Sequence, residues 1–215
     1  MIPKIIHQIW VGPKKKPVKY MQTWKDMNPE WEHIIWDDEM ISEKYPKGFR
    51  NQSKIDEIEE WAGKADIMRY EILNDFGGIY IDADSICTNS LDDHFLKHDS
   101  FACFENEQCR GNLIANGYIG AVKGCNLMKI LIEKISKMKS VSFQKTGKMA
   151  WQCVGPLLFT ETIFESNYPI SVYPSFVFIP EHYSGIVYQG NGKSYSKQFW
   201  GSTHEFKDPE YYNNL

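Results

Sequence analysis

Two aspartates, Asp82 and Asp84, stand one residue apart directly after the short apolar run Ile79-Tyr80-Ile81. Alternate side chains of an extended chain point the same way, so the two carboxylates can converge. Two such charges repel unless a cation lies between them, and oxygen ligands with room for water and phosphate suit Mg²⁺ or Mn²⁺. The pair therefore predicts a divalent-cation site that could neutralise a diphosphate. The alternative is an acidic turn, but the apolar strand before it favours the metal site.

Three further groups could complete such a site. Asp66 and Arg69 are three residues apart on a predicted helix. They could orient a ligand's hydroxyl groups beside the metal, or form a surface ion pair that contributes roughly a few tenths of a kcal/mol. Trp10 ends the first predicted strand, where its indole could stack on a base or cap the core. His204 is of interest because two aspartates leave a metal under-coordinated, so a third ligand from a distant loop is expected.

The elements that must position these residues alternate between strands and helices in the first part of the chain. Ser53 and Asp56 resemble a capping box that would begin a helix at residue 54 and carry it past Trp61. Gly63 is expected to separate that helix from the next one, which Gly77-Gly78 would end. The apolar patterning predicts strands over 4–10, 31–36 and 79–81, and helices over 18–27, 38–45 and 64–75.

The second part of the chain is less regular. An amphipathic helix is predicted over 126–139, and Gly155-Pro156 should open another helix. Residues 140–150 are polar and predict a mobile loop, and the tail over 183–215 shows little periodicity. Strand-like runs cover 100–105, 112–122 and 170–180. Helices alternating with strands early, and longer strands late, indicate an α/β fold with a mixed central sheet flanked by helices. Ligands collect at the carboxyl ends of strands in such sheets, where Trp10 and Asp82 are both predicted to lie.

Composition narrows the possible functions. A length of 215 residues suits one domain, and a net charge of -4 does not predict a nucleic-acid footprint, which needs a basic patch. No apolar run is long enough to span a bilayer, and Lys4, His7 and Gln8 interrupt the apolar start, which is unlike a signal peptide. Five cysteines without a CxxC pair favour reduced thiols. We therefore expect a cytoplasmic protein, or a domain cut from a longer chain.

Taken together, the motifs resemble the DxD region of family 32 glycosyltransferases and of their relatives, the clostridial glucosylating toxins. The matching residues appear in the family's order over about the first three quarters of the chain. They are Ile2-Pro3-Lys4-Ile5-Ile6-His7-Gln8-Ile9-Trp10-Val11-Gly12, Asn28-Pro29, Trp36-Asp37, Ala65-Asp66-Ile67-Met68-Arg69-Tyr70, Leu73, Gly77-Gly78-Ile79-Tyr80-Ile81-Asp82-Ala83-Asp84, Asn116-Gly117-Tyr118-Ile119-Gly120-Ala121 and Gly155-Pro156.

The resemblance implies a GT-A fold, with residues 1–215 as a single glycosyltransferase domain. It divides this domain into a nucleotide-binding half over 1–105 and an acceptor-side half with the tail over 106–215. It also implies a metal-dependent site for a nucleotide sugar. UDP-sugar is the preferred donor, and GDP-mannose is the next candidate because relatives use it.

The resemblance also implies roles for individual residues. Trp10 would stack on the base while the backbone of Ile9 and Val11 reads its edge, with Gln8, Tyr80, Ala83 and Trp200 completing the nucleotide site. Asp66 and Arg69 would hold hydroxyl groups of the donor sugar. Asp82 would contact the ribose, the sugar or the metal through water, and Asp84 would bind Mn²⁺ or Mg²⁺ directly. Asp66, Arg69 and Asp82 would form the catalytic set.

The tail departs from the family pattern. Many members have a histidine a few residues before a Ser-Trp pair, whereas this chain has Gln198-Phe199-Trp200-Gly201-Ser202 there and His204 offset. His204, Ser202 or water could complete the metal site, and we choose His204.

The expected function is metal-dependent transfer of a sugar to a hydroxyl of a glycan or glycoprotein acceptor. The resemblance implies retention of the anomeric configuration. An inverting enzyme would need a carboxylate base, for which Glu105, Glu107 and Glu181 are candidates. The alternatives are a nucleotide-sugar hydrolase or pyrophosphorylase and a non-catalytic, metal-stabilised carbohydrate-binding module. A pyrophosphorylase would carry a Gly-rich phosphate loop near the start, where this chain has Trp10-Val11-Gly12-Pro13 instead.

Overall fold

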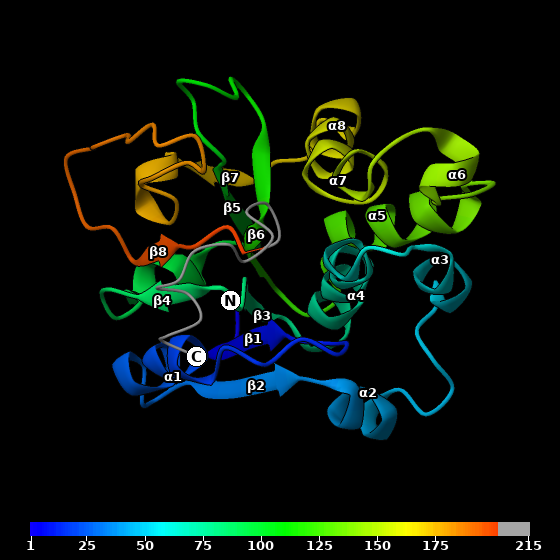
Figure 1. The fold of residues 1–215 in the computed structure, drawn as a ribbon. Coiled ribbons are helices and arrows are strands. Elements are labelled where there is room, and N and C mark those ends of the chain that lie inside the picture. Colours follow the sequence, from blue (N-terminus) through cyan, green and yellow to red (C-terminus); the bar gives the residue numbers. More distant parts are fainter. Residues whose placement is uncertain (202–215) are drawn as a thin grey trace.

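The computed structural model describes residues 1–201, which fold around a six-stranded mixed sheet (Figure 1). In chain order the elements are β1 (Ile5–Ile9), α1 (Val18–Met27), β2 (Glu32–Trp36), α2 (Asp38–Lys44), α3 (Gln52–Glu57), α4 (Trp61–Phe76), β3 (Gly78–Ile81), β4 (Ser85–Cys87), η1 (Asp93–Lys97), β5 (Ser100–Phe104), β6 (Ile114–Ala121), α5 (Asn126–Lys137), α6 (Phe143–Thr146), α7 (Ala150–Cys153), α8 (Pro156–Ser166), β7 (Ser171–Tyr173), η2 (Ser175–Val177) and β8 (Ser196–Gln198).

The main sheet has the strand order β2-β1-β3-β6-β5-β7, and β4 pairs with β8 in a separate two-stranded sheet. β1 is parallel to β2 and β3, and β5 is parallel to β7. β6 is antiparallel to both of its neighbours, β3 and β5. The predicted α/β fold with a mixed central sheet flanked by helices is therefore confirmed.

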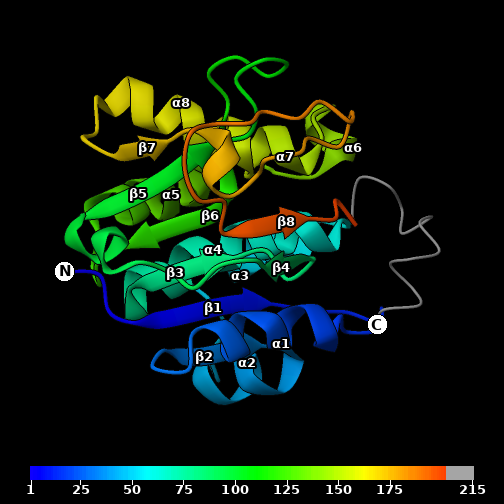
Figure 2. The same cartoon turned by 90° about the vertical axis from the view of Figure 1, so that its left-hand side faces the viewer.

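Side-chain alternation along the strands divides the core into two layers, one on each face of the sheet. On β3, Tyr80 packs into one layer while Ile79 and Ile81 pack into the other, and on β5 Ala102 and Phe101 divide in the same way. Helices α4, α5 and α8 cover the first face, and α1 with the β4–β8 pair covers the second (Figure 1). The view turned by 90° shows β1 lying between α1 and β3 (Figure 2).

The carboxyl ends of β1 and β3 form the edge at which the predicted site lies. The chain adds β2 on one side of β1 and later β3 on the other, so this edge is a switch point in the strand order, where α/β sheets bind ligands. Gly77 and Gly78 turn the chain from α4 into β3 with φ angles of 69° and 107°. A side chain at Gly78 would lie 2.7 Å from the carbonyl oxygen of Ile5, so both the conformation and the space at this turn require glycine.

Two predictions about the helices before this edge are wrong. The capping box at Ser53 and Asp56 does not form, because α3 already begins after Asn51 and ends at Glu57. Gly63 does not separate two helices but lies buried inside α4, and residues 58–60 make the break. The physical reason for the glycine is close packing, since a side chain at position 63 would collide with Ala150 of α7.

Two predictions about the second part of the chain are also wrong. The segment 140–150 is not a loop throughout, because it contains α6, and Ser140 Oγ and Val141 N donate to the Glu57 carboxylate at 2.7 and 3.0 Å. The predicted strand over 170–180 is short, since only Ser171–Tyr173 of that segment is a strand. The tail that lacks periodicity contributes β8, which pairs antiparallel with β4.

The helices with the strongest local signals match their predictions. α1 covers the predicted residues 18–27, and α8 begins with Pro156 directly after Gly155. Within residues 1–201, none of the helices is both long enough and apolar enough to cross a bilayer.

Candidate active site

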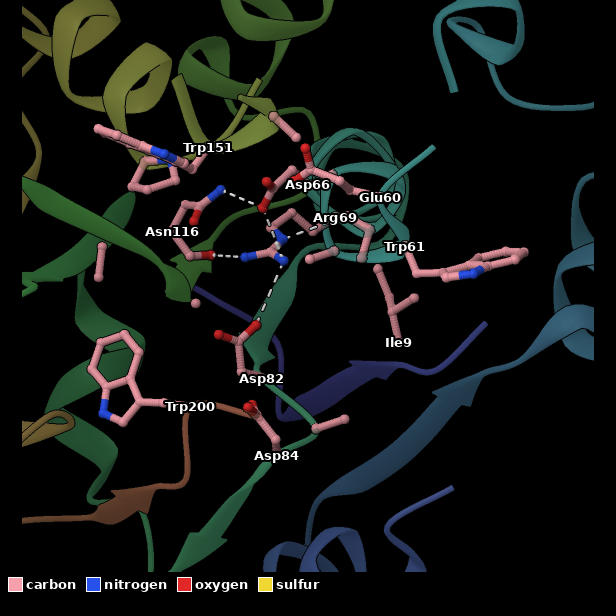
Figure 3. A pocket seen from close by; sticks show the side chains of 18 of the residues that line it. Ile9, Glu60, Trp61, Asp66, Arg69, Asp82, Asp84, Asn116, Trp151 and Trp200 are labelled. Atoms are coloured by element: carbon pink, nitrogen blue, oxygen red, sulfur yellow. Dashed lines mark hydrogen bonds and ion pairs between the residues drawn. The ribbon is translucent and has the colours of Figure 1, made fainter. Parts of the chain in front are cut away.

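A cleft of about 780 Å³ opens at the carboxyl ends of β1 and β3 (Figure 3). It brings together Asp66 and Arg69 from α4 with Asp82 and Asp84 from the segment after β3. The other predicted nucleotide-site residues that line it are Ile9, Trp10, Val11, Tyr80, Ala83 and Trp200. Residues more than 100 positions apart in the sequence therefore share one cavity.

Asp66 and Arg69 form a buried pair rather than a surface ion pair. They are 7% and 4% exposed, and Arg69 Nη2 lies 3.1 Å from Asp66 Oδ1. Asn116 of β6 holds both, because its Nδ2 donates to Asp66 Oδ1 at 2.8 Å and its carbonyl oxygen accepts from Arg69 Nη1 at 2.7 Å. Burial raises the pKa of Asp66 to about 6, although Arg69 and Asn116 act in the opposite direction. A carboxylate that is costly to bury is thus held rigidly in the cleft wall.

Arg69 also connects this pair to Asp82. Its Nη2 lies 3.5 Å from Asp82 Oδ1, and its guanidinium stacks over the Tyr80 ring at 4.2 Å from the ring centroid. The Tyr80 hydroxyl donates to the same Asp82 oxygen at 3.1 Å. One planar cation therefore positions two carboxylates, with a line of interactions from Asp66 through Arg69 to Asp82 (Figure 3).

Asp84 lies in a turn between β3 and β4 rather than in an extended strand, so the argument from alternating side chains does not describe it. Its Oδ1 accepts from Gln198 Nε2 at 2.7 Å, and its Oδ2 accepts from the Gly201 backbone N–H at 2.6 Å. The Tyr118 hydroxyl in turn donates to Gln198 Oε1 at 2.7 Å. Burial, and then the charge of Asp82, raise the pKa of Asp84 to about 6. The acidic turn and the carboxylate pair, which the sequence analysis treated as alternatives, are therefore both present.

The chemistry of this pair fits a hard divalent cation. Asp82 and Asp84 offer only oxygen atoms, repel one another without a cation, and are held by hydrogen bonds from neighbouring side chains. Residues 1–201 contain no group of three His, Cys, Asp or Glu side chains arranged to hold a metal. His204 and Ser202 lie outside the described residues. Among the described residues, Asp82 and Asp84 are thus the carboxylate pair that could hold the metal.

The end of the cleft near β1 carries the residues expected to contact the base. Trp10 is half-buried, packs against Tyr20 and donates from Nε1 to the Lys14 carbonyl oxygen at 2.9 Å. Gln8 does not line the cleft. Its side chain is fully buried, and its Nε2 lies 3.4 Å from the Asp82 carbonyl oxygen.

Several lining residues were missed by reasoning from the sequence. Asn116 lies within a motif that matched the family, but nothing local indicates that it pairs with Asp66, 50 positions away. Trp61 and Trp151 are 43% and 38% exposed, and the combination of exposure and a large apolar side chain is visible only in the structure. Glu105 lines the cleft and Glu107 does not, because Glu107 Oε1 accepts from the Ser175 N–H.

Comparison with known proteins relates this chain to glycosyltransferases. The family model "Glycosyltransferase sugar-binding region containing DXD motif" matches residues 14–102, which include Asp66, Arg69, Asp82 and Asp84. Over 98 residues the chain is 39% identical to inositol phosphoceramide mannosyltransferase 3 of Schizosaccharomyces pombe, covering 42% of this chain and 26% of that protein. The chain spans between a quarter and a half of the length of the first curated relatives it matches.

Two solved structures share the fold. The PaToxG glycosyltransferase superposes with a TM-score of 0.56 at 21% identity, covering 77% of this chain and 70% of that chain. The UDP-bound glycosyltransferase domain from the YGT toxin superposes with a TM-score of 0.54 at 10% identity, covering 80% and 79%. The fold is therefore the GT-A type that the motifs implied, and residues 14–102 match the glycosyltransferase sugar-binding region that contains the DXD motif.

Proposed function

We propose that this chain transfers a sugar from a nucleotide-diphosphate sugar to a hydroxyl of a glycan or glycoprotein acceptor. The observation that carries the proposal is the convergence of the Asp66–Arg69 pair and the Asp82–Asp84 pair in one cleft at the switch point of the sheet. The first pair suits sugar hydroxyls and the second suits a cation on a diphosphate. Neither a carbohydrate-binding module nor a simple metal site would need both.

The metal in this proposal is Mn²⁺ or Mg²⁺, held by Asp84 and, directly or through water, by Asp82, with His204 as the third protein ligand. When bound, it acts as a Lewis acid that stabilises the charge growing on the leaving diphosphate. The hydrogen bonds from Gln198 and Gly201 hold the Asp84 carboxylate in one orientation. The Tyr118–Gln198–Asp84 chain thereby links the sheet to the metal ligands.

The chain's own contribution at the donor sugar is orientation. Asp66 accepts hydrogen bonds from the sugar hydroxyls, and Arg69 donates to the sugar or to the diphosphate while keeping Asp66 and Asp82 in place. Fixed groups of this kind reduce the reorganisation needed at the transition state. We propose retention of the anomeric configuration.

UDP is the preferred nucleotide of the donor. The fold matches a glycosyltransferase domain described as UDP-bound, whereas the Schizosaccharomyces pombe relative is named a mannosyltransferase, which keeps GDP-mannose as the second candidate. Trp10 would stack on the base at the β1 end of the cleft, beside Ile9 and Val11.

The division into a nucleotide half over 1–105 and an acceptor half over 106–215 is also part of the proposal, as is a cytoplasmic location. The proposed cytoplasmic location rests on the five cysteines, which are all free thiols, as is usual in a reducing compartment.

Calorimetry with UDP and with GDP, each with and without Mn²⁺, tests the proposal. We expect UDP to bind only with the metal, and Asp84→Asn to abolish this binding. Asparagine is preferred to alanine because Asp84 also anchors the end of β8 through Gln198 and the segment after it through Gly201. Asp26→Asn on the exposed face of α1 makes the same charge change away from the cleft and should bind normally. Failure of both nucleotides to bind in the presence of Mn²⁺ would refute the transferase function.

A screen of nucleotide sugars for slow, metal-dependent donor hydrolysis then identifies the donor. Formation of sugar 1-phosphate and nucleoside triphosphate from donor and pyrophosphate would indicate a pyrophosphorylase instead. Sugar binding without any nucleotide affinity would indicate a binding module.

A further inference from the structure

A buried carboxylate, Glu105, lines the same cleft from the segment after β5 and has no part in the donor site described above. It is 7% exposed, and two side chains contact its Oε1: Arg110 Nε at 3.1 Å and His182 Nε2 at 3.3 Å. His182 Nδ1 accepts the Ser184 backbone N–H at 3.3 Å. This leaves Nε2 as the nitrogen that donates to Glu105. Arginine and histidine therefore hold Glu105 in one orientation from two directions.

The second oxygen of this carboxylate is available. No hydrogen bond or ion pair to Glu105 Oε2 is formed within residues 1–201, and that atom is not sealed from the cleft. A carboxylate oxygen accepts hydrogen bonds and cannot donate them. The free position on Glu105 therefore selects a ligand group that donates, such as a hydroxyl.

Exposed aromatic side chains line the same cleft near Arg110. The Arg110 guanidinium sits 5.2 Å from the centroid of the Trp151 ring, so Trp151 and Glu105 are joined through one side chain. Trp151 is 38% exposed and Tyr183 is 39% exposed, and both line the cleft. Trp151 and Trp200 lie on the opposite side of Arg69 and Asp82 from Ile9 and Trp61 (Figure 3). This end of the cleft is thus separate from the end assigned to the base.

We propose that Glu105, Trp151 and Arg110 form the acceptor subsite, and that the acceptor is an uncharged saccharide. The inference rests on the proposed transferase function. Glu105 Oε2 accepts a hydrogen bond from a sugar hydroxyl, and the sugar ring packs its C–H face on the exposed indole of Trp151. Glu105 is a binding group in this arrangement, not the base of an inverting reaction.

The charged side chains at this end of the cleft disfavour an anionic acceptor. Arg110 is the single cation among the described residues at this end of the cleft, and Glu105 at 3.1 Å already opposes its charge. The open oxygen of Glu105 would repel a phosphate or carboxylate placed against it. A neutral sugar ring can pack on the flat apolar surface of Trp151 and donate a hydrogen bond from a hydroxyl to Glu105 Oε2.

Saturation-transfer NMR with methyl glycosides of glucose, galactose and mannose tests this subsite, with the corresponding sugar 1-phosphates as anionic probes. Each probe is measured with and without UDP and Mn²⁺, so that failure of the nucleotide site is scored separately. We expect at least one neutral glycoside to bind and the phosphates to bind more weakly. Trp151→Ala should weaken glycoside binding roughly tenfold, which corresponds to about 1.4 kcal/mol.

Trp151→Phe keeps a flat ring and should restore most of the binding. Trp151→Ala should bind UDP as wild type does, a result that a merely structural role for Trp151 would not produce. Glu105→Gln should weaken glycoside binding and leave UDP binding unchanged. Phe164→Ala, which removes a 60% exposed aromatic ring on α8 that does not line the cleft, is the control.

Three results would overturn the proposal. They are the absence of binding by every neutral glycoside, equal binding by wild type and Trp151→Ala, and tighter binding of the sugar phosphates than of the glycosides. Normal UDP binding in the same samples would show that the proposed function survives such a result.

Discussion

Asp66→Asn should stabilise the ligand-free protein while it impairs the proposed reaction. Asp66 is buried in the cleft wall, and its pKa is raised from 3.8 to about 6 because burial outweighs the attraction of Arg69. At pH 7 Asp66 is therefore ionised, but its ionisation costs more free energy in the folded protein than in the unfolded chain. Asparagine has the shape of the protonated acid, and its amide oxygen can still accept from Asn116 and Arg69.

The magnitude follows from the shift in pKa. A group whose pKa is higher in the folded state binds more protons there, so its contribution to stability is lost as the pH rises from about 4 to about 6. The shift from 3.8 to about 6 corresponds to about 3 kcal/mol at pH 7. The difference in unfolding free energy between Asp66→Asn and wild type should thus grow from near zero at pH 3.5 to at most about 3 kcal/mol in favour of the variant.

Urea unfolding without metal or nucleotide, followed by circular dichroism at several pH values, measures this difference. Asp26→Asn, an exposed carboxylate on α1, is the matched control and should show no such growth. In parallel, donor hydrolysis by Asp66→Asn should fall by roughly 10- to 100-fold, as expected for a lost hydrogen bond to a charged group. The reasoning is refuted if the variant is less stable than wild type at pH 7, or if the difference does not depend on pH.

Two other predictions concern residues next to this site and beneath it. A methyl group at Gly117 would collide with Asp82 Oδ2, so Gly117→Ala should weaken UDP–Mn²⁺ binding roughly tenfold in calorimetry. The urea midpoint should change little, because the displaced Asp82 carboxylate can rotate. Unchanged affinity for UDP and Mn²⁺ in Gly117→Ala would show that Asp82 need not keep this position. His7 is buried in β1, donates from Nε2 to Gly77 O and accepts from Trp36, and burial lowers its pKa from 6.5 to about 4. The stability that neutral His7 contributes above pH 6.5 should therefore be lost as the pH falls toward 4, by about 3 kcal/mol. In His7→Gln the urea midpoint should fall less than in wild type as the pH is lowered from 6.5 to 4. An equal fall in the variant and in wild type would contradict the assignment to His7.

The sequence by itself determined those parts of the protein that short-range physics controls. The period of apolar residues predicted α1 over residues 18–27 and the strand before Asp82, and Gly155-Pro156 marked the start of α8. Gly77-Gly78 predicted the turn between α4 and β3, because a left-handed backbone favours glycine. The family motifs taken together, from the first strand through Asp82 and Asp84 to Gly155-Pro156, implied the GT-A fold and a diphosphate site.

Only the tertiary structure decided which side chains meet. Asp66 looked like half of a surface ion pair until α4 buried it against Asn116, a residue that the antiparallel strand β6 brings back to the same edge. Gly63 looked like a break in a helix, yet packing against α7 explains it.

The far end of the cleft depends entirely on such contacts. Glu105 and Arg110 lie on the connection between β5 and β6, Trp151 lies in α7 and His182 lies between η2 and β8. They share no common spacing. Their joint chemistry arises because the chain crosses the same edge of the sheet several times. Local sequence patterns carry no information about that long-range geometry. The residues at the acceptor end of the cleft can therefore be identified only from the tertiary structure.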